Sequence, residues 1–189
     1  ADPASAGESN TAIELSVALL GVGDSMMEIA YRLHGAARHA KLQQALRLHR
    51  ESLEELVRGV GQSHGDTVVY MARQAEVLLE LGDLKEASAL MVDVWHAWEA
   101  RVVSKIPVEA FCHQPDTLRL RMCGSLVDHA VLVADGRADT PQAERSLQAL
   151  EQQTDRLQAF YPADDRHWIA RWAREALQRA RDRPRAATP

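Results

Sequence analysis

Eight histidines and two cysteines are the residues of this chain that could bind a metal ion or attack a substrate. His34, His39 and His49 lie close together in the first third of the sequence. Metal sites on helices commonly place two histidines four residues apart, or use the HExxH and CxxC patterns. None of these spacings occurs here. We therefore predict no metal ligands and no cofactor.

Cys112 and His113 are neighbours that resemble a nucleophile and its base. Adjacent side chains on a loop rarely point at one another, and the groups that complete such a site come from elsewhere in a fold. The sequence offers no supporting set, so we predict no catalytic residues and a protein that is not an enzyme. Cys112 is either a reduced thiol or bridged to Cys123, and the sequence leaves both alternatives open.

The composition favours an all-α fold that is large enough for its own core. The chain has 189 residues, of which 46% are hydrophobic, and it is rich in strong helix formers such as Ala, Leu and Glu. A net charge of -5 disfavours nucleic acid as the main partner. No apolar run approaches the roughly 18 to 20 residues that span a bilayer. We therefore predict a soluble protein that does not insert into a membrane.

A helical hairpin is the clearest local pattern, over residues 72 to 98. Two runs with helical apolar spacing meet at Gly82 and Asp83, and the small residues Ala75 and Ala87 flank the turn. Glycine tolerates the left-handed angles that reverse a chain, and small residues let two helices cross closely. The same spacing and breaker residues predict about seven helices, over residues 10–35 (bent near Gly21 and Gly23), 37–60, 67–82, 84–104, 117–134, 141–160 and from about 166 onward.

Three predicted helix starts recur at a nearly constant interval. Asp66, Asp116 and Asp165 are separated by 50 and 49 positions. A fixed internal period is typical of stacked helical hairpins, with an unpaired last helix as a cap. His64 and His113 precede two of these starts at equivalent positions, which predicts a capping role for both.

The motifs LLELGDLKEASAL at 78–90, HQPDTLRLRM at 113–122 and YPADDRHW at 161–168 carry a family resemblance. The chain resembles long tetratricopeptide repeats such as those of kinesin light chains, and also the helical C-terminal domain of SET-and-MYND lysine methyltransferases. The resemblance implies a right-handed superhelix of hairpins. We expect one such domain over residues 10–183, between a disordered lead-in at 1–9 and a disordered tail at 184–189.

In that family the first helix of each hairpin lines a concave groove that binds a peptide or helix. Carried onto this sequence, the resemblance predicts partner contacts for eight residues: Val69, Arg73, Glu76, Arg119, Met122, His129, Trp168 and Arg171. The Lys/Asn clamp that grips chaperone tails is absent, because Cys123 and Leu126 stand where polar groups are needed.

The predicted function is thus a non-catalytic scaffold that binds a protein or peptide partner. A helical accessory domain of a larger enzyme and a secreted or surface protein with a receptor or adhesion role are the alternatives. Self-association through the C-terminal helix is a further expectation. We expect a cytoplasmic location, or an extracellular one if Ala1-Asp2-Pro3 is the remnant of a secretion vector.

Overall fold

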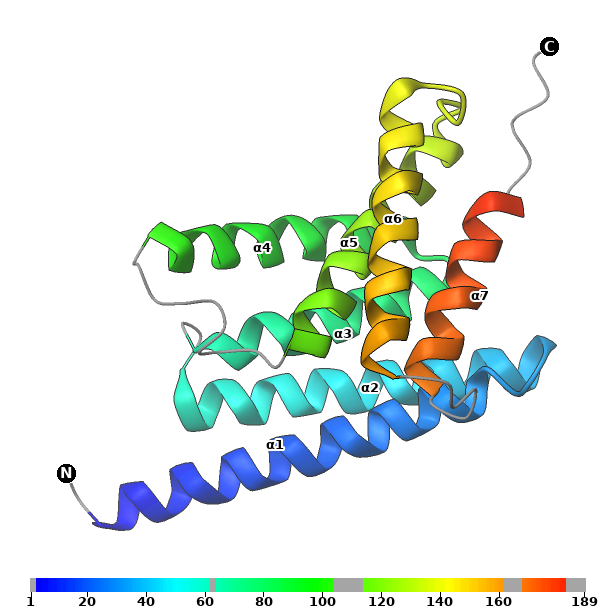
Figure 1. Ribbon diagram of the computed structural model, residues 1–189. Helices are drawn as coiled ribbons and strands as arrows, with labels where there is room; N and C mark the ends of the chain where they lie inside the picture. The colour runs from blue at the N-terminus through cyan, green and yellow to red at the C-terminus, as the bar shows by residue number, and fades with distance from the viewer. Residues whose placement is uncertain (1–2, 62–63, 104–113, 162–167, 183–189) are drawn as a thin grey trace. The chain divides into compact units, whose positions relative to one another are not determined.

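The computed structural model describes residues 3–61, 64–103, 114–161 and 168–182 (Figure 1). Within these ranges the protein is all-α and has no strand, which confirms the predicted fold class. The seven helices of the described residues are α1 (Pro3–Ala30), α2 (Gly35–Val60), α3 (Gly65–Leu81), α4 (Leu84–Val103), α5 (Gln114–Ala134), α6 (Pro141–Phe160) and α7 (Trp168–Asp182).

The helices form two compact units. The first unit covers residues 1–112 and contains α1 to α4, and the second covers residues 113–189 and contains α5 to α7. Each unit has buried apolar side chains contributed by all of its helices. Each unit is therefore described by itself below.

In the first unit, α1 and α2 pack as an antiparallel pair through small residues (Figure 1). Small side chains recur every seven positions on both helices, as Ser9, Ser16, Gly23 and Ala30 on α1 and as Ala45, Ser52 and Gly59 on α2. Two hydrogen bonds cross this seam: Ser9 Oγ donates to the Gly59 carbonyl at 2.6 Å, and Ser52 Oγ donates to the Ser16 carbonyl at 2.7 Å. Such residues allow two helix backbones to approach closely.

Helix α1 differs from the prediction in its bounds. It begins at Pro3, inside the expected lead-in, and continues through Gly21 and Gly23 without a break. Gly23 lies against the ring of His49, so its missing side chain permits the close packing of α1 on α2. The helix ends at Ala30, five residues before the predicted end.

The α3–α4 hairpin has the predicted turn. Gly82 adopts the left-handed conformation with φ of 85°, and the Asp83 N–H donates to the Leu78 carbonyl at 2.9 Å. This arrangement satisfies carbonyl groups at the end of α3. Ala75 and Ala87 are both fully buried, as expected for a close helix crossing.

The start of α3 shows which residue caps it. His64 is the N-cap, and its Nδ1 accepts a hydrogen bond from the Asp66 N–H at 3.4 Å. The capping role predicted for His64 is confirmed, whereas Asp66 lies in the first turn of the helix. His113, for which the same role was predicted, is outside the described residues.

The second unit has a core built from α5, α6 and α7. Leu120 and Met122 of α5, Leu150 and Leu157 of α6 and Trp172 of α7 are fully buried. At the turn after α5, Gly136 has φ of 70°, and Thr140 then caps α6 by accepting a hydrogen bond from the Ala143 N–H at 3.3 Å. Pro141 occupies the first helical position, where its missing N–H costs nothing.

Candidate functional site

Three of the predicted partner-contact residues lie on α3, and all three are buried. Val69 belongs to a core cluster with Leu56 and Tyr70. Nη1 of Arg73 lies 3.8 Å from Oε2 of Glu76, one helical turn away. Val69, Arg73 and Glu76 therefore contact other residues in the interior of the protein.

Two further predicted residues, Arg119 and Trp168, come together where α5 meets α7. The guanidinium of Arg119 lies over the ring of Trp168, 4.5 Å from its centroid, and 5.7 Å from the centroid of Trp172. Arg119 and Trp172 are buried, while Trp168 and Arg171 are half-buried. A cation held over aromatic rings is attracted by their negative faces. Arg119 of α5 therefore stabilises the contact of α5 with α7.

Met122 and His129 also face inward from α5. Met122 is fully buried, and its Sδ lies 4.0 Å from Oγ1 of Thr154 on α6. Nε2 of His129 lies 3.2 Å from the Ala180 carbonyl of α7, and Nδ1 lies 3.1 Å from Oγ of Ser146 on α6. Because a carbonyl can only accept, Nε2 carries the hydrogen. His129 thus links the three helices of the second unit.

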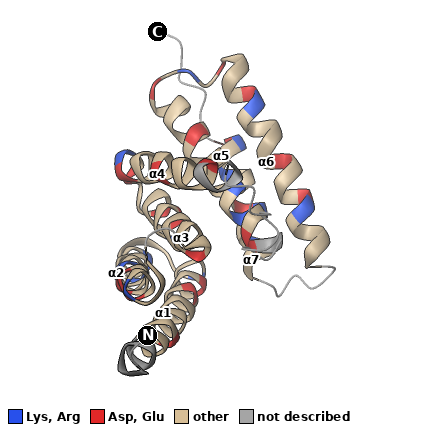
Figure 2. Cartoon of the chain, turned by 90° about the vertical axis from the view of Figure 1, so that its left-hand side faces the viewer, with Lys and Arg blue, Asp and Glu red and all other residues tan. Residues whose placement is uncertain are grey.

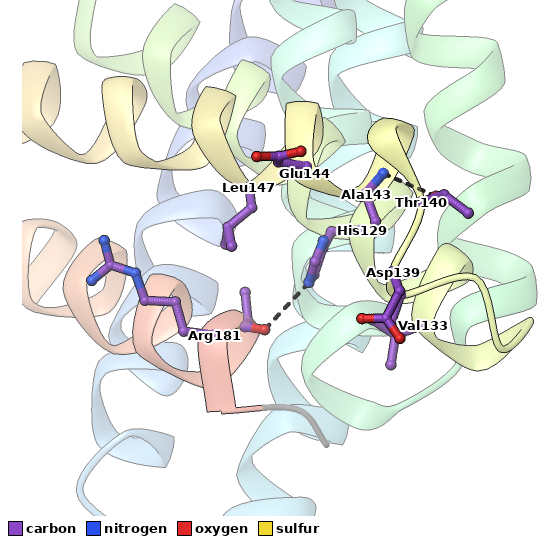
Figure 3. A pocket seen from close by; sticks show the side chains of 10 residues that line it. His129, Val133, Asp139, Thr140, Ala143, Glu144, Leu147 and Arg181 are labelled. Atoms are coloured by element: carbon purple, nitrogen blue, oxygen red, sulfur yellow. Dashed lines mark hydrogen bonds between the residues drawn. The ribbon is translucent and has the colours of Figure 1, made fainter. Parts of the chain in front are cut away.

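A hollow of about 460 Å³ opens beside His129, between the ends of α5, α6 and α7 (Figure 3). Thr140, Glu144 and Arg181 also line it. The lining groups already have structural partners: His129 bonds to the Ala180 carbonyl, Thr140 caps α6, and Arg181 pairs with Glu151 at 2.7 Å. The hollow therefore does not present a nucleophile with an adjacent base.

The sequence analysis missed an exposed apolar stripe along α1. We call this set the α1 stripe: Leu15, Leu19, Val22, Met26 and Ile29. Leu15, Val22 and Ile29 are 45%, 46% and 39% exposed, and the other two are half-buried. The intervals of four and three residues form a heptad pattern, which places all five side chains along one side of the helix. That pattern in the sequence was the signal that could have revealed the stripe.

The α1 stripe is separate from the core of the first unit. The small-residue seam with α2 lies beside it, and on the far side of that seam Leu20 packs against the Leu56, Val69 and Tyr70 cluster. At the edge nearest α2, Nζ of Lys41 lies 3.8 Å from Sδ of Met26. The stripe therefore lies beside the seam with α2 and outside the cluster of Leu56, Val69 and Tyr70.

The charged side chains of helix α1 are all acidic (Figure 2). Residues 1–31 contain no Lys or Arg and five acidic residues, namely Asp2, Glu8, Glu14, Asp24 and Glu28. Glu14 is exposed and Glu28 is half-buried, and Glu28 pairs with Arg32, which follows the helix. Asp24 lies toward α2, with Oδ1 at 3.6 Å from Nε2 of His49. Glu14 and Glu28 each stand one position before a stripe residue, about 100° away from it around the helix, and the charge of Glu28 is compensated by Arg32.

Comparison of the chain with protein-family models, curated proteins and solved structures gives no significant match. Among the described residues no helix is long and apolar enough to cross a membrane. The same described ranges contain no group of three or more His, Cys, Asp or Glu side chains arranged to hold a metal ion. The tetratricopeptide resemblance stays a prediction, and Cys112 lies outside the described residues, so its pairing with Cys123 is also untested.

Proposed function

We propose that this protein is a non-catalytic interaction module that binds a helix of a partner protein on the α1 stripe. The observation that carries the proposal is the exposure of Leu15, Val22 and Ile29 in heptad register beside the small-residue seam through which α1 packs on α2. Amphipathic helices bind such stripes by inserting side chains at matching intervals. Exposed contiguous apolar surface on a folded protein commonly marks an interaction site.

The length of the stripe suits a helix as its ligand. From Leu15 to Ile29 the helix rises by about 21 Å, at roughly 1.5 Å per residue. A partner helix of three to four turns would cover that distance. A partner that instead used the groove predicted from the family resemblance would have to displace Arg119 from Trp168 and His129 from the Ala180 carbonyl. The α1 stripe is available without such a rearrangement.

A direct test is to titrate the whole chain with a fluorescent helical peptide of about three heptads, with leucines at the seam positions and glutamines beside them. We expect saturable binding to the wild-type chain and at least about a tenfold loss of affinity in the triple variant Leu15→Gln/Val22→Gln/Ile29→Gln, because the apolar contacts are removed.

Val17→Gln is the matched control, since Val17 is 57% exposed on the same helix but is five positions from Val22 and so lies on another face. This variant is expected to bind like the wild type. Circular dichroism would verify that all variants keep their helix content. Absence of peptide binding, or equal loss in the control and the triple variant, would refute the proposed function.

A further inference from the structure

Lys41 of α2 places a positive charge at the edge of the α1 stripe. Its Nζ lies 3.8 Å from Sδ of Met26 and 3.2 Å from Oε1 of Gln44, and neither of these atoms is negatively charged. Among the described residues no carboxylate pairs with Lys41, although its side chain is half-buried. A partly buried cation is stabilised by an anionic partner, which this ammonium group lacks here.

The acidic residues of α1 do not compensate this charge. Asp24 stands two positions before Met26, about 200° away around the helix. Glu28 is already in an ion pair. Glu14 lies about 18 Å from Met26 along the helix axis, which exceeds the screening distance of roughly 8 Å at physiological ionic strength. The electrostatic potential where Lys41 meets the stripe is therefore determined by Lys41 itself.

The edge of the stripe along α2 carries no competing negative charge. Lys41, Leu48 and Glu55 recur every seven residues, which places them on one side of α2. Leu48 is half-buried and extends the apolar surface toward α2. Glu55 is compensated by Arg58, at 2.8 Å. A helix docked on the α1 stripe therefore meets the uncompensated ammonium group of Lys41 along this edge.

We infer that the α1 stripe binds an amphipathic helix of another protein that carries Asp or Glu beside its apolar seam, where the carboxylate pairs with Lys41. Charged residues beside a helix seam set the choice of partner, because unlike pairs attract and like pairs repel. Lys41 is thus a specificity-determining residue of the stripe. This inference rests on the proposed function and specifies its ligand.

A second copy of this chain supplies no carboxylate at the matching place. On the flank of the stripe that is turned away from α2, the residues next to Val22 are Ala18 and Ser25, each about one helical turn from it. Both are uncharged. On the other flank the copy would present its own Lys41, and like charges at an interface disfavour pairing. An acidic helix of another protein is therefore the better match.

The test uses the whole chain and three fluorescent helical peptides with the same leucine seam, which carry glutamate, glutamine or lysine on one flank and glutamine on the other. Because a helix can dock in either direction, the variable flank can reach Lys41. We expect the glutamate-flanked peptide to bind at least about threefold more tightly than the lysine-flanked one. The preference should shrink when salt is raised to about 1 M, where the Debye length falls to roughly 3 Å.

Reversing the charge of Lys41 is the sharper measurement. In the variant Lys41→Glu the order should invert, so that the lysine-flanked peptide binds more tightly than the glutamate-flanked one. In Lys41→Gln these two peptides should bind within about twofold of each other, and affinity for the glutamine-flanked peptide should stay within about twofold of the wild type.

Arg47→Glu is the matched control, because it changes the net charge of the protein by the same amount. Arg47 is exposed on the same helix and stands five positions before the seam residue Ser52, about 140° away around the helix. This variant should keep the wild-type order of the peptides. Circular dichroism would verify that all variants keep their helix content.

The outcomes separate this inference from the proposed function. If the three peptides bind the wild type equally, or the lysine-flanked one binds most tightly, the inference is wrong while the proposed function stands. Inversion of the order by Arg47→Glu would also overturn the inference, since net charge would then set the preference. If no peptide binds, both are wrong. Sedimentation of the wild-type chain as a dimer that Val22→Gln dissociates and Val17→Gln does not would show that a second copy covers the stripe, and the inference would also fail.

Discussion

The ring of His49 lies against the backbone of α1 and limits how closely α1 and α2 can approach. A Cβ atom added to Gly23 would lie 2.1 Å from Cδ2 of His49. His49 is buried and its Nε2 faces Oδ1 of Asp24 at 3.6 Å, so the ring has little room to move aside. Gly23 is thus required by packing at this crossing.

The first prediction compares two glycines of α1. Gly23→Ala should lower the free energy of unfolding by about 1–3 kcal/mol, because the methyl group overpacks the contact with His49. Gly21→Ala should instead raise it by about 0.5–1 kcal/mol, since an added Cβ meets nothing within 4 Å and alanine stabilises a helix interior. Urea denaturation of both variants measures the difference. Effects of the same sign would contradict the close packing at His49.

A second prediction concerns the charge of Arg119. Arg119→Met keeps the apolar stem but removes the cation from Trp168 and Trp172, which should cost about 0.5–2 kcal/mol. Arg121→Met on the same helix is the control, because Arg121 is exposed and its replacement should change stability by less than about 0.5 kcal/mol. Chemical denaturation followed by tryptophan fluorescence measures both. Equal stability of the two variants would argue against a cation–π contribution.

Tyr70 should make the stability of the protein sensitive to alkaline pH. Burial raises the pKa of Tyr70 above its ordinary value of 10.0, and Asp66 and Asp24 raise it further, against the opposing effects of a hydrogen bond with Ser16 and of Arg73. The folded state therefore holds the phenolic proton at a pH where the unfolded state releases it. The contribution of Tyr70 to the free energy of unfolding is therefore fully present below about pH 10. It is lost as the pH rises toward the folded-state pKa.

The third prediction follows from that sign. Tyr70→Phe cannot release a proton, so its free energy of unfolding should fall less steeply than that of the wild type between about pH 9 and pH 11. Urea midpoints at several pH values in this range measure the slopes. Identical slopes for the two proteins would show that Tyr70 titrates alike in the folded and unfolded states.

At the scale of the elements, the turns were predictable because particular residues dictate them. Gly82 at the end of α3 and Pro141 at the start of α6 lie where the sequence predicts a helix to stop and to begin. The start of α1 at Pro3 was missed because residues 1–9 hold no strong apolar pattern, and Gly23 was interpreted as a bend although it packs against His49. A glycine alone does not reveal which of these two roles it has.

The candidate site was less predictable than the helices. The family resemblance predicted partner contacts on α3 and α5. Arg119 and His129 of α5 instead lie in the interior. The spacing of Leu15, Val22 and Ile29 was visible, but an apolar heptad equally describes a face buried against a neighbouring helix. Which of the two seams of α1 meets α2 depends on contacts such as the one between Ser52 and Ser16, and these arise only in the folded protein.

At the scale of the whole molecule, the repeat period of the sequence does not predict the division into two units. Positions 66, 116 and 165 recur regularly, yet the first interval crosses the boundary between the units and the second does not. A periodic sequence specifies equivalent helices, whereas the division depends on how many contacts form within each group of helices. The α1 stripe belongs to the first unit and the Arg119 cluster to the second.

The last prediction tests whether the two units open independently. Destabilising the second unit with Arg119→Met should speed hydrogen exchange of protected amides in residues 114–161 and 168–182 by roughly 2- to 30-fold, in line with the expected loss of stability. Amides of α2 and α3 should keep their wild-type rates, because the core cluster of Leu56, Val69 and Tyr70 is formed within the first unit. Gly23→Ala should produce the reverse pattern. Mass spectrometry of both variants measures the exchange, and faster exchange throughout the chain in either one would show that the units unfold as a single cooperative body.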